Sequence, residues 1–248
     1  MIYYGHRIRK RSVTIFFDEK ETSIMTKNLT TSNTTELVFI LDRSGSMAGL
    51  TSDTIGGFNA MIEKQKTTDG TVLVSTVLFD HETVVLHDRV PLEDVRPMTE
   101  HDYSARGSTA LFDAVGGAIH HIGNIHKYAR REDVPAKTLF VITTDGMENA
   151  SRRYDREKVK SMIERQTKHF GWEFLFLGAN IDAAETAESI GIHKDHAVDY
   201  VADARGTHKN YAAVSAAVTQ VRACEPLGTE WRKDIDRDYQ KRRGLFRK

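Results

Sequence analysis

Short apolar runs recur along this chain and alternate with longer segments whose apolar residues are three or four positions apart. The compact runs lie at 36–41 (ELVFIL), 72–79 (VLVSTVLF), 138–143 (TLFVIT), 173–177 (EFLFL) and 197–201 (AVDYV). Runs this short and apolar are typical of strands buried on both faces of a sheet. Strands that alternate with helices need crossover connections, so the pattern predicts a mostly parallel sheet with helices on both faces.

The remaining segments complete the predicted fold. A short turn at 80–82 leads into a hairpin partner at 83–86, which makes about six strands with one antiparallel pair. The predicted helices lie at 51–64, 110–130, 155–169 and 182–190, from a cap at Thr207 onward, and at 227–239. The predicted fold class is therefore α/β, a doubly wound and mostly parallel sheet.

Charge and cysteine content exclude several functions. The 248 residues carry no formal net charge, but the ends are basic: 1–27 hold six Lys and Arg against three acids, and 222–248 hold nine against five. The acidic body between them argues against a nucleic-acid partner. Cys224 has no partner for a disulfide, and no apolar run is long enough to cross a membrane. We expect a cytoplasmic protein.

The composition divides the chain into three parts. The central part, 35–222, is the predicted domain, and 223–248 is a charged C-terminal helix or tail. The N-terminal part, 1–34, shows no sustained period, and Met25 is a natural start for the domain. We expect 1–24 to be a dispensable extension, unless Val13–Phe17 adds a strand to a sheet edge or covers a helix.

Oxygen-bearing side chains follow two of the predicted strands. Asp42, Ser44 and Ser46 come directly after the first strand, and Gly45 lets the chain turn tightly between the two serines. Asp145 follows the strand at 138–143 in the same way. In open α/β sheets, ligands bind beyond the carboxyl ends of the strands.

A third loop supplies another hydroxyl. Thr109 lies in the loop before the long helix. If the first and fourth strands are neighbours, Asp42 and Asp145 lie side by side and repel each other unless a cation lies between them. The hydroxyls of Ser44, Ser46 and Thr109 complete an all-oxygen set. Such a set suits Mg²⁺, and Mn²⁺ fits it as well.

The three motifs together resemble the von Willebrand factor A family and its metal-ion-dependent adhesion site. The resemblance rests on D-x-S-G-S after a buried strand, a Thr in a GST loop and a strand ending in TTDG, in this order over 36–221. It implies a Rossmann-like sheet with a short antiparallel edge strand. It also implies direct metal ligation by the two serines and Thr109, with Asp42 and Asp145 bound directly or through water. Where integrins carry a further acidic pair, this chain has Met47, Ala48 and Gly49, so a second adjacent metal site is not expected.

Simpler roles compete with each of these assignments. Asp42 and Ser44 could be helix caps, but capping does not explain why Thr109 and Asp145 reach the same edge. Arg106 and Glu148 are candidate contacts for a partner, against the alternatives of a solvated arginine and an exposed loop acid. Three histidines of the long helix are interpreted as surface residues; they are His120, His121 and His126.

The sequence favours binding over catalysis. It has neither G-x-x-x-x-G-K-[S/T] nor G-x-G-x-x-G, and no Ser/His/Asp set suggests itself. We therefore expect a non-enzymatic domain whose Mg²⁺ coordinates a Glu or Asp carboxylate of a partner protein. Two alternatives stay open: a Mg²⁺-dependent phosphoryl or ester hydrolase, which would need a general base, and an accessory subunit of an AAA+ ATPase complex, by family analogy.

Overall fold

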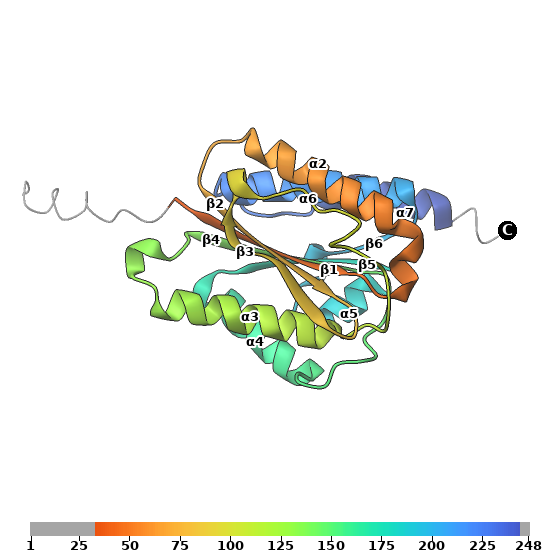
Figure 1. Ribbon diagram of the computed structural model, residues 1–248, viewed down its shortest axis with the longest axis horizontal. Coiled ribbons are helices and arrows are strands. Elements are labelled where there is room, and N and C mark those ends of the chain that lie inside the picture. Colours follow the sequence, from red (N-terminus) through yellow and green to blue (C-terminus); the bar gives the residue numbers. More distant parts are fainter. Residues whose placement is uncertain (1–32, 244–248) are drawn as a thin grey trace, which may run out of the picture. The chain divides into compact units, whose positions relative to one another are not determined.

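The computed structural model of the chain describes residues 33–243, in which strands and helices alternate (Figure 1). The six strands are β1 (Thr35–Asp42), β2 (Val72–Phe79), β3 (Thr83–Pro91), β4 (Lys137–Thr144), β5 (Glu173–Ala179) and β6 (Ala197–Tyr200). They form one sheet in the order β3-β2-β1-β4-β5-β6. All neighbouring strands are parallel except β3, which runs antiparallel to β2 at the edge. The predicted α/β fold class is confirmed.

Helices cover both faces of the sheet, as the crossover connections require (Figure 1). They are α2 (Thr51–Lys66), α3 (Leu111–Tyr128), α4 (Arg156–Phe170), α5 (Ala183–Ser189), α6 (Ala204–Arg222) and α7 (Lys233–Arg243). Helices α2, α6 and α7 lie on one face, and α3, α4 and α5 lie on the other. Every residue of β1 is buried, because alternate side chains enter the two cores.

Two details of the prediction were wrong. Helix α6 is capped by Asp203, whose carboxylate accepts a hydrogen bond from Gly206 N at 2.8 Å, while Thr207 is buried in the first turn. His126 is not a surface residue, because its side chain is only 10% exposed. It lies over the start of β1, where its Nε2 is 2.9 Å from a carboxylate oxygen of Glu36.

The ends of the chain are only partly covered by the structure. The predictions for 1–24, Met25 and Val13–Phe17 lie outside the described residues. After α6 the chain returns to the sheet, where Trp231 and Ile235 are buried in the same core as α2. Among residues 33–243, no helix has both the length and the apolar character that crossing a membrane requires.

A buried histidine on β3 should make stability depend on pH. His87 is 3% exposed, and its Nδ1 is 3.0 Å from Thr76 Oγ1. Burial lowers the pKa of His87. The charge of Arg96 also lowers this pKa, whereas the charge of Asp102 raises it. Because the folded pKa is depressed, the stabilisation is present above the unfolded pKa of about 6.5 and is lost as the pH falls below it.

We therefore expect the free energy of unfolding to decrease on acidification from about pH 7 to pH 5. A His87→Gln variant should show a shallower decrease over this interval, because it removes one titrating group. Urea unfolding at the two pH values measures the difference. Equal slopes in the two proteins would assign the pH dependence to other groups.

Candidate metal centre

Asp42 is the last residue of β1 and is held from two sides. Its Oδ1 accepts a hydrogen bond from Ser44 N at 2.6 Å, and its Oδ2 accepts one from Thr144 Oγ1 at 2.6 Å. Thr144 ends β4, which pairs with β1 in parallel, as the site prediction required. The side chain of Asp42 is therefore fixed at the carboxyl edge by both its own loop and the neighbouring strand.

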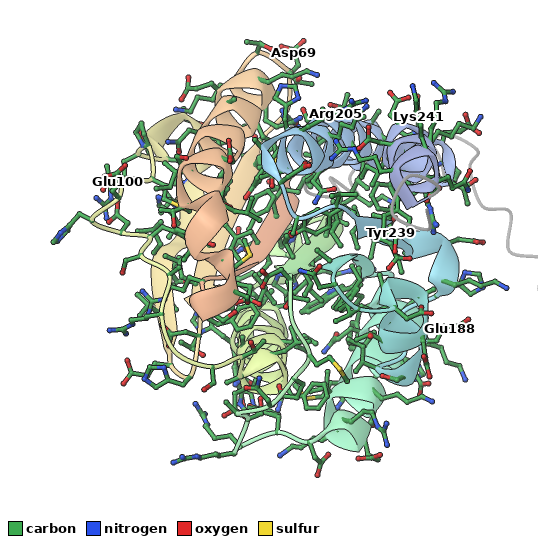
Figure 2. All side chains as sticks on the ribbon, turned by 90° about the vertical axis from the view of Figure 1, so that its right-hand side faces the viewer. Asp69, Glu100, Glu188, Arg205, Tyr239 and Lys241 are labelled. Carbon is green, nitrogen blue, oxygen red and sulfur yellow. The ribbon has the colours of Figure 1, made fainter. Side chains whose placement is uncertain are left out.

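The second carboxylate meets the serine hydroxyls at the same edge. Ser46 Oγ donates to Asp145 Oδ1 at 2.5 Å and lies 3.1 Å from Ser44 Oγ. Figure 2 shows the side chains from the side at which β1 ends in Figure 1. The structure thus brings the D-x-S-G-S loop and Asp145 together, although 99 positions separate Ser46 from Asp145.

Thr109 joins this group from the third loop. Its backbone N donates to Asn149 Oδ1 at 2.9 Å, and its carbonyl accepts from Asn149 N at 3.0 Å. A Cβ on Gly146 would lie 3.5 Å from Thr109 Oγ1 and 3.9 Å from Ser46 Oγ, so both hydroxyls border this glycine. Thr109 Oγ1 and Ser46 Oγ therefore lie on the same side of the loop that follows Asp145.

Electrostatics at this edge favour a cation. Burial raises the pKa of Asp42 against the opposing hydrogen bonds from Thr144 and Ser44. Burial also raises the pKa of Asp145, and the charge of Asp42 raises it further. A divalent cation would remove the cost of two buried, neighbouring negative charges. The donors are all oxygen atoms, which fits Mg²⁺ or Mn²⁺.

Comparison with solved structures identifies the fold. The vWF domain of the type V pili tip protein Mfa5 from Porphyromonas gingivalis aligns with a TM-score of 0.53 at 11% sequence identity. The alignment covers 78% of this chain and 97% of that domain. This chain has the fold of a von Willebrand factor A domain. The predicted resemblance is thereby confirmed at the level of the fold.

Two further solved structures share the von Willebrand factor A fold. Proximal thread matrix protein 1 from the mussel byssus, solved with a zinc-occupied MIDAS motif, aligns at 15% identity with a TM-score of 0.53 over 77% of this chain and 46% of that one. A von Willebrand factor type A protein from Catenulispora acidiphila aligns at 15% identity with a TM-score of 0.50 over 76% and 43%. The chain spans less than half the length of these two proteins. No protein-family model and no curated protein matches the sequence.

An ion-pair cluster that the sequence did not predict connects two loops of the candidate metal centre. Asp80, the residue directly after β2, is fully buried, and its Oδ2 lies 3.1 Å from Arg43 Nε and 3.0 Å from Arg106 Nε. Arg43 belongs to the D-x-S-G-S loop, and Arg106 lies three residues before Thr109. The Asp80 carbonyl also accepts from Ala110 N at 2.8 Å. Asp80 therefore holds both loops.

Distance alone would allow a metal ion in this cluster as well. The ligand atoms of Asp80, His81 and Glu82 all lie within 4.8 Å of one another. However, Asp80 already faces two guanidinium groups, and Glu82 Oε2 accepts from Arg106 Nη2 at 2.9 Å. A cation would compete with both arginines. We interpret the cluster as an ion-pair network that supports the loops.

Both candidate partner contacts from the sequence analysis are engaged within the chain. Arg106 is half-exposed and makes the two ion pairs with Asp80 and Glu82. Glu148 is not a free loop acid: its carboxylate accepts from Phe112 N at 2.9 Å and from Ser151 N at 2.7 Å. Glu148 thus caps α3 and ties the loop after β4 to that helix.

Removing the Asp80 carboxylate should destabilise the fold. In Asp80→Ala, the buried Arg43 loses its counter-charge, and we expect a loss of about 3 kcal/mol in the free energy of unfolding. Urea unfolding measures this loss. Glu82→Gln is the matched control, since it removes an exposed acid from the same cluster and should change stability much less. Equal effects of the two substitutions would contradict the role assigned to Asp80.

Proposed function

We propose that this chain is a metal-dependent protein-binding domain of the adhesion type. One Mg²⁺ would be held by Asp42, Ser44, Ser46, Thr109 and Asp145. The observation that carries the proposal is the meeting of two buried carboxylates and three hydroxyls at the carboxyl edge of neighbouring strands. The zinc-occupied MIDAS motif of the mussel protein supports a metal at the corresponding place in this fold.

The residues of the site would have two roles: the carboxylates would hold the ion, and the hydroxyls would leave it able to bind a further carboxylate. Thr144 and the Ser44 backbone N already hold both oxygens of Asp42, so this carboxylate is oriented before an ion binds. Neutral hydroxyl ligands donate little charge, which leaves the ion electron-poor. A bound Mg²⁺ would then supply an open coordination position for a Glu or Asp carboxylate of a partner protein.

We propose binding rather than catalysis for this site. A hydrolase would need a general base beside the metal. The nearest carboxylates, Asp42 and Asp145, are the proposed ligands, and Asp80 and Glu148 are engaged in holding loops. We also propose a cytoplasmic location, on the ground that Cys224 is the only cysteine.

A capture experiment tests the proposal. The full chain is immobilised and exposed to cell extract in Mg²⁺, and bound proteins are eluted with EDTA and identified. We expect a specific partner that is retained by the wild type but not by Asp145→Ala, and whose binding is lost when one of its own Glu or Asp residues is replaced. Equal retention in Mg²⁺ and EDTA would overturn the proposed function, as would metal-dependent turnover of generic phosphoesters.

A further inference from the structure

The loop between β4 and α4 is held firmly, although it contains no helix or strand. Asp113, in the first turn of α3, accepts hydrogen bonds from the backbone N atoms of Arg152, Arg153 and Tyr154 at 3.0, 2.8 and 2.9 Å. Ser151 Oγ accepts from Asp113 N at 3.0 Å. Together with the contacts of Glu148 to the same turn, these bonds fix the loop beside the metal site, because α3 begins two residues after Thr109.

This fixed loop presents a mixed apolar and cationic surface. Met147, two residues after Asp145, has 74% of its surface exposed. Arg152 and Arg153 are also exposed. The charge of Arg153 acts on the Asp113 carboxylate, but among the described residues neither arginine has a carboxylate oxygen within ion-pair distance. Arg153 lies over the Tyr154 ring at 5.8 Å, and Lys158 Nζ lies 4.9 Å from the same ring. Arg153 and Lys158 therefore share the Tyr154 ring, and Arg152 is the chain neighbour of Arg153.

The charge of this loop differs from that of the body around it. Residues 28–221 carry more acids than bases, whereas the loop 146–154 carries two arginines against the single acid Glu148. Such a group attracts an acidic partner segment. The acidic body would repel the uniformly charged surfaces of nucleic acids and anionic membranes. Met147 adds a flexible apolar contact that adapts to different side chains.

We propose that this loop is the second contact of a docking surface for an acidic segment of a partner protein. One carboxylate of the segment would bind at the metal, a second would meet Arg152 and Arg153, and an apolar side chain would pack on Met147. This inference rests on the proposed function, because the first carboxylate needs the metal. It adds that the partner carries at least two acids and an apolar residue.

Selection from a library of displayed random peptides tests this inference. The full chain is immobilised in Mg²⁺, and the peptides released by EDTA are sequenced. For the wild type we expect peptides with two or more acids and an apolar residue. For Arg152→Gln/Arg153→Gln we expect peptides with a single acid. A peptide from the wild-type pool should bind the double variant about three to ten times more weakly, because exposed ion pairs each contribute little.

A matched control removes the same charge at the opposite edge of the sheet. Arg131 precedes β4, and Lys168 lies in the last turn of α4, so Arg131→Gln/Lys168→Gln should select the same peptides as the wild type. The outcomes separate the two proposals. If EDTA releases no enriched peptides from the wild type, the proposed function is wrong. If the enriched peptides carry one acid, or are unchanged in Arg152→Gln/Arg153→Gln, only the docking surface is wrong.

Discussion

Replacing Asp42 or Asp145 by alanine is expected to abolish binding of Mg²⁺ and Mn²⁺. The wild-type chain should bind one ion, because its two carboxylates and three hydroxyls meet at a single place. Either substitution removes half of the negative charge and a hydrogen-bond partner of the serine loop. Calorimetric titration with Mn²⁺ measures the change. Asp69→Ala is the control, since Asp69 is an exposed acid in the loop before β2 (Figure 2).

The same variants should stay folded without metal. The β-sheet core contains no metal ligand, and the raised pKa values of Asp42 and Asp145 indicate that both carboxylates oppose folding when ionised. Mg²⁺ should raise the free energy of unfolding of the wild type only, by about 2.7 kcal/mol when the ion is at a hundred times its Kd, and its melting temperature should rise accordingly. Undiminished Mn²⁺ binding by the Asp42→Ala/Asp145→Ala double variant would contradict the site. Complete unfolding in EDTA would make the ion structural.

The sequence predicted the strands well because their burial is nearly complete. In β1 and β4, side chains enter a core on both faces, and the resulting apolar runs are unmistakable. Asp42 ends β1 and Asp145 directly follows β4, so the candidate site followed once the two strands were taken as neighbours. The hairpin strand predicted at 83–86 extends to Pro91 as β3. The prediction was too short because most residues of this edge strand are exposed and its apolar pattern is mixed.

Contacts between distant polar residues could not be predicted in this way. Asp80 meets Arg43 and Arg106 only because three loops converge at one edge, and nothing near Asp80 in the sequence marks it. Thr207 was chosen as a cap by residue type, but Asp203 is the residue that reaches the free backbone N atoms. The backbone at the start of α6 also passes close to the Val201 carbonyl. A Cβ on Gly206 would lie 1.9 Å from that oxygen, so only glycine fits.

Glu36, at the opposite end of β1, also makes polar contacts that the sequence did not predict. Its replacement should have the largest effect on stability. Its side chain is fully buried inside the first apolar run. It accepts from Arg89 Nε at 2.8 and 3.1 Å and lies 2.9 Å from His126 Nε2. In Glu36→Ala both partners lose their carboxylate, and we expect a loss of about 3–5 kcal/mol. The melting temperature should fall by about 2–4 °C for each kcal/mol.

Two comparisons separate a lost charge pair from a lost packing contact. In Glu36→Leu/Arg89→Met, apolar side chains of similar size replace both charges, and we expect most of the stability to return, since a well-packed apolar pair can replace a buried ion pair. Urea unfolding of the single and double variants measures this recovery. Glu36 precedes Asp42 by six residues at the far end of the strand, so the Mn²⁺ affinity of the folded variants should equal that of the wild type. A loss below about 1 kcal/mol in the free energy of unfolding of Glu36→Ala would mean that water replaces the carboxylate. A changed Mn²⁺ affinity would mean that strain at Glu36 reaches the metal edge through β1.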